Sequence, residues 1–182
     1  MSRSRAEGTK AMATPDGIEE PAEKGGLWDR HASPISILLL GALMLAALSG
    51  VAGGQPGERR LADFGEAKLL VKSPSVIRNG EFFEMEIAVE AKTDLDAPAI
   101  EVSPSLWRDM TINTMMPAPA EELFEKGGYR FAYDRMPRGK RLLIKIDGQI
   151  NPPLFAGTRG DIAVYDGGRR LGAMPLAIEV LP

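Results

Sequence analysis

Apolar and polar residues alternate with a period of two in several segments of the chain from residue 67 onward. In residues 82–91, FFEMEIAVEA, one face carries Phe83, Met85, Ile87, Val89 and Ala91, and the other carries Glu84, Glu86 and Glu90. The same alternation recurs in residues 129–133, 142–146, 162–164 and 176–180. A period of two predicts strands in a sheet that has one face buried and the other in solvent.

Turn residues separate these segments, at residues 79–80, 127–128, 137–139 and 166–168. The Asp-Gly pair at residues 166–167 predicts the clearest hairpin. No long amphipathic helix is expected beyond Val51, and only PAEELFEK, residues 119–126, favours a helical turn or two. Short strands with frequent turns predict an all-β, antiparallel β-sandwich of about seven strands over residues 67–182. Trp107 fits either the core of this sandwich or its rim.

A different pattern lies upstream, where 19 consecutive residues from Ile35 to Gly53 carry no charge. As a helix this run is about 28 Å long, close to the roughly 30 Å hydrocarbon core of a bilayer. We therefore predict a single transmembrane helix over residues 34–54 that is retained as a signal anchor. The alternative is a signal peptide cleaved after Ala52, which the long apolar run and the long leader of mixed charge disfavour.

These patterns divide the chain into four parts. Residues 1–33 lack apolar periodicity and predict a disordered cytoplasmic tail. Residues 55–66 predict a linker between the membrane helix and the β-domain. Basic residues flank the apolar run on both sides, so charge bias does not decide the orientation. The exported type of fold places the C-terminal domain on the periplasmic side of the cytoplasmic (inner) membrane.

Small residues recur at every fourth position of the apolar run, namely Ala42, Ala46, Gly50 and Gly54. Such a stripe lets two transmembrane helices approach closely. It is compatible with a homo-oligomer formed through the membrane helix, and the alternative is a chance pattern, which is common in spans rich in alanine and glycine.

Composition narrows the possible chemistry. The 182 residues carry a formal net charge of −3 with both signs spread along the chain, so nucleic-acid binding is not expected. There is no cysteine, and the single histidine, His31, precedes the apolar run. Disulfides, thiolate chemistry and an imidazole site in the β-domain are therefore excluded. With no glycine-rich phosphate loop and no serine at a motif spacing from a lysine, we expect neither an enzyme nor a cofactor.

The first candidate site is a group of methionines in residues 109–116, DMTINTMM, namely Met110, Met115 and Met116. Thioethers suit Cu(I), but methionines also fill core gaps or cover binding surfaces. Because no histidine or cysteine of the domain joins them, we favour an interaction surface and expect no metal site. Asp94 and Asp96 fit a turn better than a calcium loop, which needs more oxygen ligands.

The second candidate site is a cationic turn in residues 135–145, RMPRGKRLLIK. Its cations are Arg135, Arg138, Lys140, Arg141 and Lys145. They suit anionic lipid headgroups or an acidic partner. The interpretation that we favour is a solvated turn whose cations face the stripe of Glu84, Glu86 and Glu90 on a neighbouring strand.

The run APAIEVSPSLWRDMTINTMMP, with GGYRFAYDRMPRGKRLLIKIDGQINPP and GDIAVYDGG after it, resembles the immunoglobulin-like repeat domains of bacterial surface and envelope proteins. The resemblance covers residues 68–182. It implies an immunoglobulin-like β-sandwich fold and an extracytoplasmic placement, and it assigns no functional residue. We expect a single-pass, non-catalytic accessory or scaffold protein whose partners are the lipid bilayer and another membrane or periplasmic protein. The alternatives are a cleaved, secreted structural or adhesive sandwich and a periplasmic copper carrier.

Overall fold

The computed structural model describes residues 27–50, 57–125, 127–152, 154 and 157–182, with the backbone alone for residues 27–33. One helix and eleven strands lie within these residues. The elements are α1 (Leu27–Leu48), β1 (Glu58–Asp63), β2 (Ala67–Ser73), β3 (Val76–Arg78), β4 (Phe82–Ala91), β5 (Pro98–Val102), β6 (Met110–Met116), β7 (Glu121–Glu125), β8 (Gly128–Ala132), β9 (Arg141–Ile150), β10 (Thr158–Asp166) and β11 (Arg169–Leu181). Contacts divide the chain into two compact units, Met1–Met44 and Leu45–Pro182.

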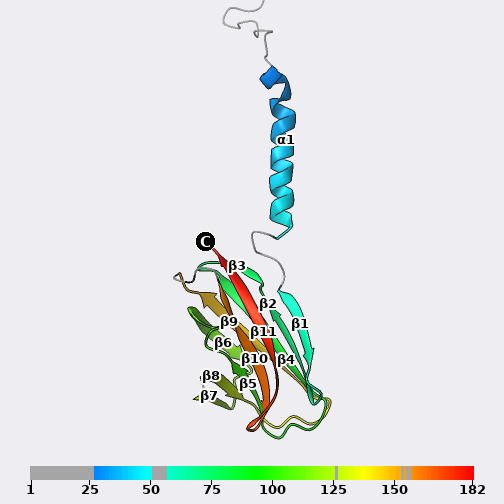
Figure 1. Ribbon diagram of the computed structural model, residues 1–182, viewed down its shortest axis with the longest axis vertical. Coiled ribbons are helices and arrows are strands. Elements are labelled where there is room, and N and C mark those ends of the chain that lie inside the picture. Colours follow the sequence, from blue (N-terminus) through cyan, green and yellow to red (C-terminus); the bar gives the residue numbers. More distant parts are fainter. Residues whose placement is uncertain (1–26, 51–56, 126, 153, 155–156) are drawn as a thin grey trace, which may run out of the picture. The chain divides into compact units, whose positions relative to one another are not determined.

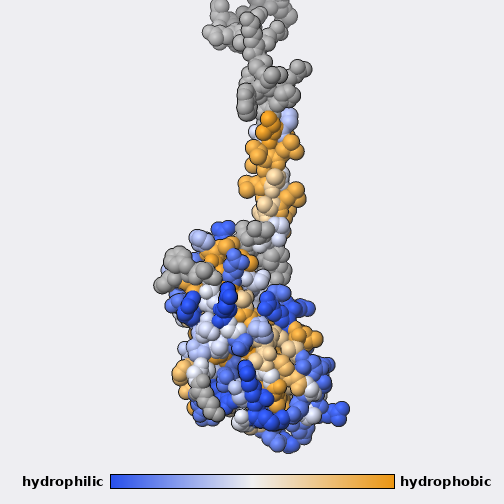
Figure 2. All heavy atoms as spheres, in the orientation of Figure 1, coloured by the Kyte–Doolittle hydropathy of each residue, from blue (hydrophilic) through white to orange (hydrophobic). Residues whose placement is uncertain are grey.

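Helix α1 exposes apolar side chains along its described length (Figure 2). Its exposed large residues are Ile35, Ile37, Leu38, Leu39, Leu40, Leu43, Met44, Leu45 and Leu48. Gly50 follows the end of the helix with φ 77°, a left-handed conformation that stops α-helical hydrogen bonding. Within the part of the chain that the structure describes, we find no helix with the length and apolar content needed to cross a membrane.

The transmembrane helix expected over residues 34–54 is therefore not confirmed, and two related expectations change. Helix α1 begins at Leu27, so the expected tail of residues 1–33 overlaps the helix, and residues 1–26 lie outside the described part of the chain. In the expected small-residue stripe, Ala42 and Ala46 are exposed within α1. Gly50 departs from the stripe because its left-handed backbone breaks the helical repeat, and Gly54 lies outside the described residues.

The strands form two sheets (Figure 1). One is antiparallel and five-stranded, in the order β1-β2-β4-β9-β6. The other is six-stranded, in the order β3-β11-β10-β5-β8-β7, and only its β3–β11 pair is parallel among the described strands. Apolar side chains from both sheets meet in one core, for example Ile87, Ile144 and Ile162. This confirms the two-sheet, all-β architecture of the domain.

Strand β4 shows how the alternation works. The predicted inner-face residues Phe83, Met85, Ile87, Val89 and Ala91 are each at most 6% exposed, and Ala88 of the other face is also buried, at 3%. On the outer face, Glu86 and Glu90 pair with Lys72 and Lys68 of β2, at 3.5 and 3.9 Å. Lys145 and Arg141 of β9 lie opposite the same two glutamates in register. Two cations of the predicted cationic segment therefore face the glutamate stripe, as the favoured interpretation required.

Two segments differ from expectation, and the sandwich has eleven described strands where about seven were predicted. Strand β1 lies inside the expected linker of residues 55–66, where it pairs with β2 along its whole length. Strand β7 lies where PAEELFEK favoured a helical turn. A hairpin with β8 overrides that local preference, because pairing supplies hydrogen bonds that an isolated helical turn lacks.

The predicted hairpin at residues 166–168 is confirmed. Asp166 lies opposite Arg169, and Gly167 takes the positive φ of 57° that such a tight turn needs at its first central position. Trp107 is only 9% exposed and belongs to the core cluster, so of the two predicted positions it takes the core.

Candidate functional site

The three candidate methionines lie on β6, the last strand of the five-stranded sheet. Met110 and Met115 are half-buried, whereas Met116 is 61% exposed. Neighbouring residues on a strand point to opposite faces, so Met115 and Met116 diverge. The structure therefore brings two of the three methionines together and leaves the third on the outer surface.

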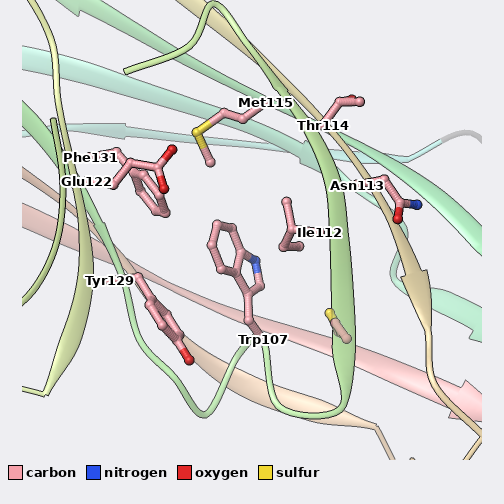
Figure 3. A pocket seen from close by; sticks show the side chains of 9 residues that line it. Trp107, Ile112, Asn113, Thr114, Met115, Glu122, Tyr129 and Phe131 are labelled. Carbon is pink, nitrogen blue, oxygen red and sulfur yellow. The ribbon is translucent and has the colours of Figure 1, made fainter. Parts of the chain in front are cut away.

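Met110 and Met115 line a pocket of about 350 Å³, which we call the aromatic pocket. It lies between β6 of one sheet and the β7–β8 hairpin of the other (Figure 3). Its lining residues are Trp107, Met110, Ile112, Asn113, Thr114, Met115, Glu122, Tyr129 and Phe131. The volume falls in the usual range for sites that bind small molecules or single side chains.

Aromatic rings form the inner wall of this pocket. The ring of Trp107 lies 5.6 Å from that of Phe131 and 5.9 Å from that of Tyr129, between centroids, in tilted arrangements that stabilise aromatic pairs. Tyr129 in turn lies 5.2 Å from Phe124 of β7. Because Trp107 and Phe131 are buried while Tyr129 and Phe124 are 39% and 63% exposed, the aromatic surface extends from the core to the solvent.

A tight turn delivers Trp107 to this position. The amide of Met110 donates to the carbonyl of Trp107 at 3.2 Å, and Asp109 within the turn has the left-handed φ of 56° that aspartate tolerates better than most residues. The carbonyl of Asp109 accepts from the amide of Asn151 at 2.9 Å, which ties the turn to the chain that follows β9. The backbone that carries the indole is therefore held by one hydrogen bond within the turn and by another to Asn151.

A β-bulge in β6 shapes the facing wall. Ile112 pairs with Gly148 and Thr114 with Asp147, so Asn113 is the extra residue without a partner in the register. Without the bulge, residues 112 and 115 would point to opposite faces, but the extra residue puts both Ile112 and Met115 on the pocket side (Figure 3). Thr114 is fixed by a hydrogen bond that its hydroxyl donates to Asp147 at 2.7 Å.

Two polar groups of the pocket lack partners among the described residues. The Nε1–H of Trp107 is buried and makes no hydrogen bond there. Figure 3 shows the carboxylate of Glu122 directed into the pocket, and we find no hydrogen bond or ion pair to it within the described part of the chain. The hydroxyl of Tyr133 donates a hydrogen bond to the sulfur of Met115, another lining residue, at 3.4 Å. Burial and, after it, the charge of Glu122 raise the pKa of Tyr133 to about 12.

The residues of the cationic turn make different contacts. Arg135 pairs with Asp94 and Asp96 at 3.0 and 3.1 Å, and the amide of Arg138 donates to Asp94 at 2.8 Å. The two aspartates are thus held by a cation and a turn amide, which agrees with the turn interpretation.

Arg135, Lys140 and Arg141 line a second pocket, of about 260 Å³, whereas Arg138 does not. Pro117 and Ala118, from the connection that follows β6, line the same pocket. The structure therefore brings the connection after the candidate methionines next to the cationic turn, although the two are far apart in sequence.

The sequence patterns indicated Met110 and Met115 but missed Trp107, Glu122, Tyr129 and Phe131 as parts of one site. The alternation of Tyr129 and Phe131 signalled a strand and nothing more. Local preference favours a helical turn for residues 119–126, and in such a turn the side chain of Glu122 would have no defined position relative to Trp107. The bulge at Asn113 has no sequence signature that separates it from an ordinary strand residue.

No family model matches this chain, and no curated protein matches it. Among solved structures, it is similar to the chitin-binding domain of a chitinase from Pyrococcus furiosus, with 14% identity, a TM-score of 0.38, and coverage of 63% of this chain and 99% of that one. It is also similar to the C-terminal domain of wzt, with 15% identity, a TM-score of 0.33, and coverage of 72% and 85%. These likenesses amount to a weak resemblance to β-rich domains, and they do not show an immunoglobulin-like repeat.

Proposed function

We propose that this protein is a non-catalytic binding protein, in which the β-sandwich recognises another membrane or periplasmic protein through the aromatic pocket. The observation that carries the proposal is the pocket itself. It combines aromatic and thioether walls with a carboxylate and an indole N–H that have no partner among the described residues. Concave apolar sites with a few convergent polar groups are the usual form of a ligand site.

The strand order supports an immunoglobulin-like type for the sandwich. In chain order, β2, β4, β5, β6, β9, β10 and β11 occupy the places of strands A to G, since one sheet contains β2-β4-β9-β6 and the other β11-β10-β5. Strands β1 and β3 are then additions at the opposite edges. The β7–β8 hairpin is an insertion between the fourth and fifth of these strands, and it builds one wall of the aromatic pocket. One wall of the proposed binding site is thus an insertion into the seven-strand framework.

The apolar segment Ile35–Gly53 is proposed as the membrane anchor, with the N-terminus in the cytoplasm and the sandwich in the periplasm. The exposed apolar side chains of α1 support this, because nine large ones in the described part of the helix are 42–73% exposed. Anchoring the domain near a membrane partner raises the effective concentration of one for the other.

The function is tested by placing a photo-crosslinking amino acid in the full-length protein in its native membranes. Position Asn113, an exposed residue of the β6 bulge that is among those lining the aromatic pocket, is compared with Ala177, an exposed position on β11. A discrete adduct from position 113 and none from position 177 is expected. Equal labelling from both positions, or none from either, would contradict a binding site in this pocket.

A further inference from the structure

We infer that the aromatic pocket accepts a basic side chain, arginine or lysine, presented by a protein partner; this specificity rests on the proposed binding function. The inference combines the charge of the pocket, the chemistry of its walls and the way in which the two neighbouring strands are protected from pairing.

The charge of the pocket is negative. Glu122 is the one charged residue among the nine that line it. The nearby cation Arg130 is already engaged, since it lies 3.9 Å from Glu101, 3.8 Å from Glu125 and 4.0 Å from the ring centre of Tyr165. It is therefore held by other groups and is not free to neutralise Glu122. A cationic ligand would pair with Glu122, and an anionic one would be repelled.

The walls suit a cation that is carried on an apolar stem. The faces of aromatic rings attract ammonium and guanidinium groups, most strongly when water is excluded. The methylene groups of arginine and lysine pack on apolar surface while the charged end stays at a polar site. Ile112, Met115 and Tyr129 offer such a surface in the same pocket as the carboxylate of Glu122.

The unpaired indole N–H of Trp107 adds a donor on the inner wall, where Figure 3 shows its nitrogen on the side facing Ile112. A pocket that contains both an unpaired donor and a carboxylate favours a ligand that has both an acceptor and a cation. A basic residue in a polypeptide has both, because its main-chain carbonyl accepts a hydrogen bond.

The neighbouring strands favour capture of a side chain over addition of a strand. Strands β6 and β7 are the last strands of their sheets, and both carry features that discourage pairing with another chain. Strand β6 has the bulge at Asn113. Strand β7 is five residues long, and three of them, Glu121, Glu122 and Glu125, are acidic.

The test uses the full chain in detergent micelles and the peptides acetyl-Ala-X-Ala-amide, with X as arginine, lysine, norleucine or glutamate. The protein has two tryptophans, so the indole N–H signal of Trp107 reports on the pocket by NMR and that of Trp28 serves as an internal reference. We expect saturable shifts of the Trp107 signal with arginine and lysine, binding about tenfold weaker with norleucine, and none with glutamate.

Two matched variants complete the test. Glu122→Gln is expected to weaken arginine binding about tenfold and to leave norleucine binding unchanged. Glu121→Gln removes the same charge from the neighbouring residue of β7, which does not line the pocket, and is expected to change neither. Equal binding of arginine and norleucine, or an unchanged Glu122→Gln variant, would overturn the inference.

The two proposals fail in distinguishable ways. If position 113 still crosslinks to a protein but the peptides show no preference for a cation, the specificity is wrong and the binding function stands. If crosslinking from position 113 also fails, the pocket is not the binding site and both proposals fall.

Discussion

Trp107 has two roles, since it fills part of the core and also forms the inner wall of the aromatic pocket. Its contacts with Phe131 and Tyr129 join a buried ring to an exposed one. Its place in the core predicts a contribution to stability, and the proposed function adds one to binding, so substitutions that keep or remove the ring volume are compared.

Replacement of Trp107 by alanine is expected to destabilise the domain by about 3–5 kcal/mol, because it removes a large buried ring and leaves a cavity. Phe is the matched control. It keeps most of the volume and removes an N–H that has no partner among the described residues, so we expect a loss below about 1.5 kcal/mol. Denaturant unfolding of the full chain in detergent measures both, and a similar loss for the two variants would contradict this account.

Tyr133 gives a pH dependence with a defined sign. Burial first, and then the charge of Glu122, raise its pKa to about 12 in the folded protein, against about 10 for an exposed tyrosine. The neutral phenol is therefore favoured in the folded state. Its contribution to stability is complete below about pH 10 and is lost as the pH rises toward 12.

Absorbance of tyrosinate during a pH titration measures this shift. The pKa of Tyr165 is also raised, by burial first, so the comparison is between Tyr133→Phe and the unaltered protein, and the substitution should remove the component that titrates near pH 12. A titration curve that Tyr133→Phe leaves unchanged at high pH would show that the side chain is not buried as described.

At the scale of elements, β6 and the β7–β8 hairpin face each other across the aromatic pocket and come from different sheets. The bulge at Asn113 has two consequences. It keeps Met110, Ile112 and Met115 on the pocket side of β6, and it interrupts the regular edge that another chain would need for pairing.

Deletion of Asn113 tests the second consequence. The register on both sides of the bulge is preserved when the extra residue is removed, since Ile112 and Thr114 already pair with consecutive residues of β9. We expect the shortened protein to fold and to self-associate through a straightened β6 edge. Analytical ultracentrifugation over a range of concentrations checks this, and Asn113→Ala, which keeps the bulge, should behave like the unaltered protein.

At the scale of the whole molecule, the proposed arrangement is a binding domain tethered through an apolar segment. In native membranes the full-length protein should resist extraction with alkaline carbonate, and its N-terminal sequence should begin upstream of Gly53. Release by carbonate in an unprocessed form would refute the anchor. A mature N-terminus at Gly53 would instead support the cleaved, secreted alternative.

Much of the fold could be predicted from local patterns. Alternation in β4 and the Asp-Gly turn at residues 166–167 correctly indicated a buried face and a hairpin, because side-chain direction along a strand depends only on neighbours in the chain. Residues 119–126 could not be predicted in this way. Their helical preference is local, whereas the hydrogen bonds that make β7 a strand come from β8.

The sequence by itself determined that the domain is all-β and which faces of its strands are buried. It also excluded cysteine and, within the β-domain, histidine from the chemistry of the protein. Only the tertiary structure decided that Trp107, Met115, Glu122 and Tyr129 share one pocket. The physical reason is that this pocket depends on one unpaired residue in β6 and on an inserted hairpin in the opposite sheet. The bulge is set by pairing with β9, which is distant in sequence, and the hairpin joins the opposite sheet through β5. The alternation of apolar and polar residues along one strand does not show which strands pair.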